Sequence, residues 1–202
     1  MRDWWLRTLL VLQRPKPVFV ALRDDSKESI DSRSEPVLAI VMLAGIAAVL
    51  STHKAGTLMD DTEFDGLLVA IWAFIGGSIY GFIAYYVFGA ALYWSGKWLG
   101  SQGTYRRARH VLAFAAMPIA LSLVLWPIKL AVLGEDVFRT GGSDHGGGIA
   151  VFNVLQFAFF VWSAALLLIG VRAVHGWTWQ RAAVPTAITI AVPLVIALVS
   201  GA

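Results

Sequence analysis

Five long apolar stretches, separated by shorter polar segments, run through the 202-residue chain. They cover residues 36–52, 66–94, 110–133, 149–171 and 184–202. A helix needs about 20 apolar residues to cross a bilayer, so each stretch is near or above the required length. The second stretch would reach about 43 Å as a helix, and must tilt or project beyond a hydrocarbon core of about 30 Å. The pattern predicts an all-α membrane protein, a bundle of five transmembrane helices.

The residues before the first stretch predict a cytoplasmic arm and polar linker (1–35), followed by the five-helix transmembrane domain (36–202). Residues 2–13 predict an amphipathic helix at the membrane interface. Its apolar face repeats at helical spacing: Trp5, Leu9 and Leu12.

Prolines mark both boundaries of this arm. Pro15 and Pro17 end the amphipathic helix, because each lacks a backbone N–H. Residues 24–35 predict a polar linker, with an exposed helix as the alternative. Pro36 is expected at the first position of the first span, where a missing N–H costs nothing.

Charge alternates from one polar segment to the next. Basic residues dominate before the first stretch, between the second and third, and between the fourth and fifth. Acidic residues dominate the other two segments, which include Asp60, Asp61, Glu63, Asp65, Glu135, Asp136 and Asp144. The positive-inside rule therefore predicts a cytoplasmic amino terminus and an external carboxyl terminus. A re-entrant segment at 52–65 or a partly inserted last stretch are alternatives, and neither preserves the alternation as well.

Composition agrees with a membrane protein and leaves no room for a separate soluble catalytic domain. Apolar residues make up 58% of the chain and charged residues 14%, whereas soluble domains average about 25% charged residues. The net charge of +3 does not indicate nucleic-acid binding, because the basic residues are sorted to one side of the membrane. The absence of cysteine excludes disulfides and thiolate chemistry.

The second stretch contains two glycines four residues apart, Gly77 and Gly81, a spacing that is typical of helix packing in membranes. Small residues four apart let membrane helices approach closely, so we interpret the pair as a packing face. The alternative is a ligand groove that Tyr80 and Tyr85 enter.

Three further residues interrupt the apolar spans. Pro118 and Pro193 release backbone carbonyls one turn earlier, which bends a helix or, in some transporters, marks a substrate site. Lys129 lies near the outer end of the third stretch. Snorkelling to the headgroups, or pairing with Glu135 or Asp136, accounts for it, and a gating or substrate role is the alternative.

The acidic segment 60–65 and the histidines do not predict a metal site. Asp61, Glu63 and Asp65 resemble half of a calcium loop, but Trp72 stands where the closing glutamate is needed. A weak cation site with Asp144 or His145 is the alternative. The predicted topology separates His53 and His145 from His110 and His175. We therefore predict no metal, no cofactor and no enzymatic activity.

The segment from Gly100 to Pro118 carries a family resemblance. Gly103-Thr104-Tyr105-Arg106 and the following Ala and Pro118 resemble the Gly-Thr-Tyr/Phe-Arg…Ala…Pro segment of Yip1 domain membrane proteins. The Trp-rich amino terminus with Pro15 and Phe19 is similar to the opening of bacterial members. The run from Trp162 through His175-Gly176 to Arg181-Ala182 is similar to a further family segment.

The resemblance implies five transmembrane helices with a cytoplasmic amino terminus. Eukaryotic members associate with Rab GTPases and with each other in vesicle traffic. This chain lacks their long amino-terminal region with its Asp-Leu-Tyr-Gly-Pro-like motif, so no Rab-type partner is predicted. The short form resembles prokaryotic members, which implies a place in the bacterial cytoplasmic membrane.

Basic and aromatic residues gather in the segments predicted to face the cytoplasm. Arginine binds phosphate with paired donors, so this cluster predicts a surface for anionic lipid or a protein partner; the alternative is that the cluster only anchors the topology. Its members are Tyr105, Arg106, Arg107, Arg109, Arg172, His175 and Arg181. We predict a non-enzymatic protein, acting as a homo-oligomer or with another membrane protein, that organises lipids or partners. The alternative is a small transporter or channel with a path past Gly77, Tyr80, Tyr85 and Pro118.

Overall fold

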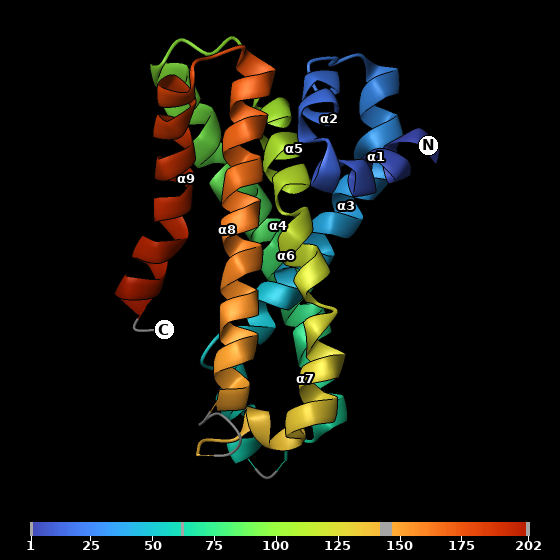
Figure 1. The fold of residues 1–202 in the computed structure, drawn as a ribbon, viewed down its shortest axis with the longest axis vertical. Helices are drawn as coiled ribbons and strands as arrows, with labels where there is room; N and C mark the ends of the chain where they lie inside the picture. The colour runs from blue at the N-terminus through green and yellow to red at the C-terminus, as the bar shows by residue number, and fades with distance from the viewer. Residues whose placement is uncertain (1, 62, 142–146, 201–202) are drawn as a thin grey trace.

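The computed structural model describes residues 2–61, 63–141 and 147–200, and every regular element among them is a helix (Figure 1). The α-helices are α1 (Arg2–Gln13), α2 (Pro15–Ala21), α3 (Lys27–Leu50), α4 (Gly66–Trp98), α5 (Tyr105–Ala115), α6 (Met117–Ser122), α7 (Leu125–Leu133), α8 (Gly147–His175) and α9 (Trp179–Ser200). Two short 3₁₀ helices are η1 (Ala55–Asp60) and η2 (Glu135–Phe138). The prediction of an all-α protein is confirmed.

Within the described parts of the chain, four helical segments are long and apolar enough to cross a membrane. They are Lys27–Leu50, Gly66–Trp98, Tyr105–Leu133 and Gly148–His175. The chain is thus an integral membrane protein with several apolar helices. Helix α9 corresponds to the predicted fifth span and contains both Pro185 and Pro193. Its crossing of the membrane stays a prediction.

The first span begins earlier than predicted. Ser26 caps α3, and its side-chain oxygen accepts a hydrogen bond from the Ser29 backbone N–H at 3.3 Å. Because this cap starts the helix nine residues upstream, Pro36 lies inside α3, and its predicted place at the first helical position is wrong. Of the predicted linker 24–35, the part from Lys27 onward is helical, as in the alternative.

The third predicted stretch is divided into α5, α6 and α7. It begins at Tyr105, because the Thr104 hydroxyl oxygen caps α5 by accepting from the Arg107 N–H at 3.1 Å. Pro118 lies in the first turn of α6 and lacks the N–H that would continue α5. The second stretch begins at Gly66, where Asp65 caps α4, and continues to Trp98, beyond the predicted end.

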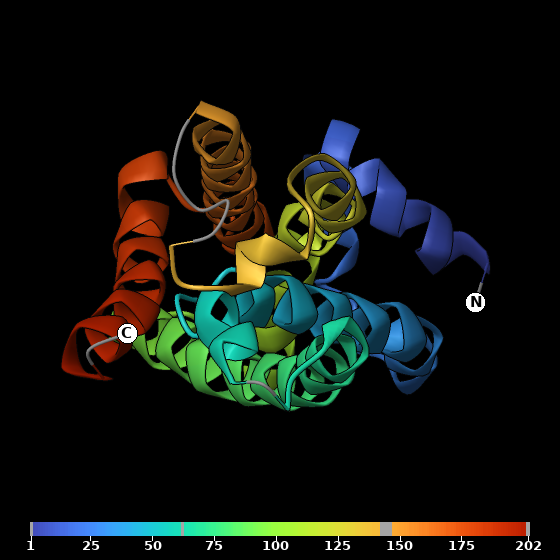
Figure 2. The ribbon, with the colours of Figure 1, turned by 90° about the horizontal axis from the view of Figure 1, so that it is seen from below.

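Helices α1 and α2 belong to the same core as the bundle. Trp4, Val11 and Phe19 are buried in one cluster with Phe114 of α5 and Val171 of α8. The predicted arm 1–35 therefore packs against the transmembrane helices, and Figure 2 shows it on the opposite side of the bundle from α9.

The buried face of α1 differs from the predicted face. Trp4, Thr8 and Val11 are buried, whereas Trp5 is 43% and Leu9 60% exposed. Two neighbouring stripes of α1 are largely apolar, and the stripe with Thr8 faces the bundle because its hydroxyl donates to the Trp4 carbonyl at 2.9 Å. The outer stripe suits lipid contact, and the interfacial position of α1 stays a prediction.

Glycines hold α3 and α4 close together. A Cβ atom added to Gly45 of α3 would lie 2.6 Å from the Gly81 Cα atom, and one added to Gly77 would lie 2.5 Å from the Ile46 Cα atom. Both distances are too short for real side chains. The Gly77–Gly81 pair therefore forms a backbone-to-backbone contact, the arrangement that small residues permit between membrane helices.

Candidate functional site

The predicted basic and aromatic residues lie together at one end of the bundle. This end, called the basic end below, is where α4 ends, α5 begins, α8 ends and α9 begins, at the top of Figure 1. The opposite end carries η1, η2 and the acidic segments and is called the acidic end. At the basic end, the seven candidate residues come from α5, α8 and α9.

Arg109 lies among three tyrosines. Its guanidinium carbon is 5.0 Å from the ring centre of Tyr85, 4.4 Å from that of Tyr86 and 4.7 Å from that of Tyr105. The Tyr105 hydroxyl donates a hydrogen bond to the Tyr86 carbonyl at 2.8 Å, which joins α5 to α4. Gly89 faces the Arg109 stem, so its missing side chain makes room for the arginine. Such cation–π contacts hold a cation in place while preserving its charge.

Two tryptophans near the start of α9 hold two more arginines. The Arg172 guanidinium lies 4.3 Å from the Trp179 ring centre, and the Arg181 guanidinium lies 4.7 Å from that of Trp177. Arg181 also donates to the Leu99 carbonyl, which ties α9 to the segment after α4. The face of each guanidinium is thereby covered by a ring.

His175 belongs to the same cluster. Its ring stacks on Trp177 with ring centres 4.4 Å apart, and its Nδ1 atom lies 3.3 Å from the Ser101 hydroxyl. It therefore fixes the α8–α9 connection against the segment between α4 and α5.

Arg107 is engaged within the protein. It forms an ion pair with Asp25 at 2.7 Å, and Asp25 also pairs with Arg33 at 3.3 Å. Thr104 donates to the same Asp25 carboxylate at 3.1 Å. Because Asp25 takes up its charge, Arg107 is less suited to an external anion than the prediction supposed. Arg106, by contrast, is exposed and has no hydrogen bond or ion pair with any described residue.

Sequence reasoning missed Arg33 and Asp25. The Arg33 side chain is fully buried, although the sequence placed it in a polar linker. It also donates to the Asp24 carbonyl at 2.9 Å. The sequence signal for this contact was the position of Arg33, three residues before the predicted apolar span. That position does not identify Asp25 as the partner of Arg33.

The acidic end is closed by contacts between η1 and η2. The Asp60 carboxylate accepts hydrogen bonds from the Thr140 N–H at 2.8 Å and from its hydroxyl at 2.5 Å. The Thr140 hydroxyl, the stronger influence, lowers the pKa of Asp60 below its ordinary value. Trp126 stacks on Phe138, with ring centres 5.8 Å apart.

No group of three potential ligands among the described residues could hold a metal ion. Asp61 accepts from the Glu63 N–H at 3.1 Å, and Asp65 caps α4. His53 is exposed at this end, whereas His110 is buried in α5. Asp144 and His145, the other candidate cation ligands, lie outside the described residues.

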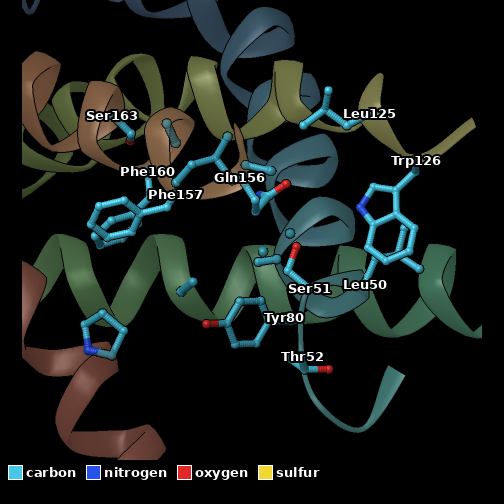
Figure 3. Close-up of a pocket in the computed structure, with 18 of the residues that line it drawn as sticks. Leu50, Ser51, Thr52, Tyr80, Leu125, Trp126, Gln156, Phe157, Phe160 and Ser163 are labelled. Atoms are coloured by element: carbon cyan, nitrogen blue, oxygen red, sulfur yellow. The ribbon is translucent and has the colours of Figure 1, made fainter. Parts of the chain in front are cut away.

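A cavity of about 770 Å³ lies between α3, α4, α8 and α9 and extends to α7 (Figure 3). Tyr80, Gly81 and Tyr85 of the predicted groove line it, as does Lys129. Gly77 and Pro118 are not among its lining residues. The structure thus places Gly77 in the α3–α4 contact and the two tyrosines at the cavity.

Comparisons with known proteins bear on the family of this chain. The family model of the Yip1 domain matches residues 9–201, which is nearly the whole chain. No curated protein and no solved structure matched it. The match covers Pro15 and Phe19 of the amino-terminal segment, the segment around Tyr105 and the α8–α9 connection, all of which carried the resemblance; Trp4 and Trp5 precede it. The chain belongs to the Yip1 domain family.

Proposed function

We propose that this protein binds anionic lipid headgroups at its basic end and thereby organises lipids or partner proteins in the membrane, without enzymatic activity. The observation that carries the proposal is the stacking of Arg109, Arg172 and Arg181 on aromatic rings at one end of the bundle. Exposed Arg106 lies on the same helix as Arg109.

An arginine held against an aromatic ring keeps its charge and its N–H donors for binding phosphate. The guanidinium carbon of each of the three arginines lies within 4.7 Å of the centre of an aromatic ring, and guanidinium N–H donors can match two phosphate oxygens. The Nε atoms of Arg109 and Arg172 are buried and have no hydrogen-bond partner among the described residues. Because these Nε atoms are buried, contact with a headgroup would be made by the terminal guanidinium N–H groups.

The basic end is proposed to face the cytoplasm of a bacterium. Anionic lipids of the cytoplasmic leaflet attract basic residues with about 1 kcal/mol for each residue near the surface. The acidic end would then lie outside, as the charge alternation predicts. A homo-oligomer or a second membrane protein remains the proposed protein partner, for which the outward apolar residues of α4, among them Ile79 and Ile83, provide a surface.

The test is the lipid that stays bound after gentle extraction, identified by mass spectrometry. Replacing Arg106, Arg109, Arg172 and Arg181 together by glutamine should lower the ratio of phosphatidylglycerol to phosphatidylcholine retained from mixed vesicles. Arg139→Gln is the matched control, because Arg139 is exposed at the acidic end. An unchanged ratio in the folded fourfold variant would remove the support for the proposal.

The cavity favours a second candidate function, a small transporter or channel. Its lining reaches from Thr57 at the acidic end to Leu167. The chain has no cysteine, so Ala84→Cys and Ala164→Cys would each place a single thiol on the cavity wall. Transport predicts that an impermeant thiol reagent reaches these cysteines from both sides of the membrane. Reaction from the acidic end alone would count against it.

A further inference from the structure

The cavity is divided into a polar part and an apolar part. Hydroxyl groups of Ser51, Thr52 and Thr57 line it near the acidic end. Phe157, Phe160 and Ile190 line the part farther from that end. In Figure 3, Ser51 and Thr52 lie toward one side of the close-up and Phe157 and Phe160 at the other, with Tyr80 between them. Ser163 lies beside the two phenylalanines, and its hydroxyl donates to the Ala115 carbonyl at 2.7 Å. Such a division matches an amphiphile with a polar head and a hydrocarbon chain.

Lys129 gives the polar part its charge. Among the described residues that line the cavity it is the one lysine or arginine, and none of these is an aspartate or glutamate. Its ammonium nitrogen lies 4.4 Å from the Trp126 ring centre. No ion pair joins it to Glu135 or Asp136, contrary to one explanation that the sequence offered, and Asp136 pairs with Arg139 at 3.9 Å instead. A half-buried cation without a carboxylate is a favourable partner for an anion.

A polar side chain near Lys129, that of Asn153, has an N–H donor for that anion. Asn153 lines the cavity, is exposed to it, and makes no hydrogen bond to another described residue. The Asp60 carboxylate does not line the cavity and accepts hydrogen bonds from the N–H and hydroxyl of Thr140, which does line it. The neighbouring Gln156 differs, because its amide nitrogen donates to the Ser122 hydroxyl at 3.0 Å.

We propose that this cavity binds one anionic amphiphile, with its headgroup at Lys129 and Asn153 and a hydrocarbon chain along Phe157, Phe160 and Ile190. The volume of about 770 Å³ lies within the range of about 300–1,000 Å³ typical of small-molecule sites, which are mostly apolar with a few placed polar groups. Phe157 is 65% exposed, so the wall of α8 is open to an entering chain. The proposed headgroup position at Lys129 and Asn153 lies toward the acidic end and does not use the stacked arginines, although Tyr85, which contacts Arg109, also lines the cavity.

Photoreactive probes test the proposal on the full-length protein in phosphatidylcholine vesicles. The probes are a diazirine fatty acid, a diazirine phosphatidylglycerol and, as the uncharged reference, a diazirine diacylglycerol. At least one anionic probe should label cavity residues such as Ala84, Phe160 or Ala164. Labelling by phosphatidylglycerol identifies a membrane lipid as the ligand, and labelling by the fatty acid alone identifies a free anionic chain. If both anionic probes label only outward residues, such as Ile83 and Val161, the proposal is overturned.

Five variants distinguish the contribution of the Lys129 charge to labelling from that of the cavity volume. Lys129→Gln should lower cavity labelling by the anionic probe about tenfold, as expected when a hydrogen bond to a charged group is lost, without changing diacylglycerol labelling. Lys129→Arg should retain labelling, and Lys54→Gln should leave it unchanged, because Lys54 is exposed outside the cavity. Ala164→Phe should block labelling, whereas Ala158→Phe on the outer face of α8 should not. Wild-type labelling in both Lys129→Gln and Ala164→Phe overturns the proposal.

Discussion

The Asp25 carboxylate lies 2.7 Å from the Arg107 guanidinium and joins the segment before α3 to the first turn of α5. The other oxygen of the carboxylate pairs with buried Arg33. One acid therefore pairs with two arginines, offsets one of their two positive charges and reduces the repulsion between them. This contact holds the amino-terminal helices against the bundle at the end where the stacked arginines lie.

Removing that acid should destabilise the protein. Asp25→Asn leaves Arg33 buried without a counterion, and an unsatisfied buried group costs about 1–3 kcal/mol or more when it is charged. We expect a lower midpoint of thermal unfolding in detergent. Asp31→Asn, an exposed acid on α3 with no ion pair to a described residue, is the control. Equal midpoints for both variants would show that the ion pair does not hold the amino-terminal segment.

The α3–α4 contact should not tolerate a side chain. Gly45→Ala would place a methyl group against the backbone of Gly81, and overpacking of this kind costs about 1–3 kcal/mol. Gly76→Ala is the matched control, because a Cβ atom there would meet nothing within 4 Å. Thermal unfolding should separate the two. If Gly45→Ala is as stable as Gly76→Ala, the helices do not pack at this distance.

The closure of the acidic end should weaken in acid. The pKa of Asp60 is lowered below 3.8 by the Thr140 hydroxyl and N–H, so the carboxylate stabilises the folded form. That stabilisation is fully present above about pH 3.8 and is lost as the pH falls through the lower, folded-state pKa. Hydrogen exchange of the Thr140 amide, corrected for its intrinsic rate, should accelerate over that range. In Asp60→Asn, the Thr140 amide should exchange faster already at neutral pH and should show no further acceleration as the pH falls. An acceleration of equal size in this variant would exclude Asp60 as its cause.

Single cysteines test orientation and the number of spans. We expect an impermeant reagent added to intact cells to label Lys54→Cys and Arg139→Cys at the acidic end, and to spare Ser26→Cys and Thr178→Cys at the basic end. Five spans place Ala202→Cys outside, where it is labelled as well. Protection of the cysteine at position 202, with the other four as expected, would indicate that α9 does not cross.

Periodicity and charge predicted the all-α fold, the main apolar helices and the gathering of basic residues at one end. These features follow from burial and backbone hydrogen bonding in lipid, which act on every stretch of sequence. Local chemistry also predicted the Gly66 start of α4 and the small-residue pair at Gly77 and Gly81. The family resemblance, carried by the segment around Tyr105, is confirmed by the match over residues 9–201.

Partners distant in sequence were not predictable. Arg109 meets tyrosines of α4 only because α4 and α5 pack, and Arg107 meets Asp25 across 82 positions. Helix α3 begins before Pro36 because Ser26 caps it. The sequence contains this capping signal, but the prediction gave more weight to Pro36. The cavity depends on how the elements from α3 to α9 are spaced, which no single segment encodes.

The selectivity of the protein for anionic lipid tests the central claim most directly. Spin-labelled phosphatidylglycerol and phosphatidylcholine, each added to vesicles containing the reconstituted protein, report the fraction of lipid held at its surface by electron paramagnetic resonance. The wild type should hold phosphatidylglycerol in preference to phosphatidylcholine, and added salt should weaken the preference. The variant with glutamine at Arg106, Arg109, Arg172 and Arg181 should lose most of it, whereas Arg139→Gln should keep it. Equal selectivity in the wild type and the folded fourfold variant would contradict the claim that the stacked arginines bind anionic headgroups.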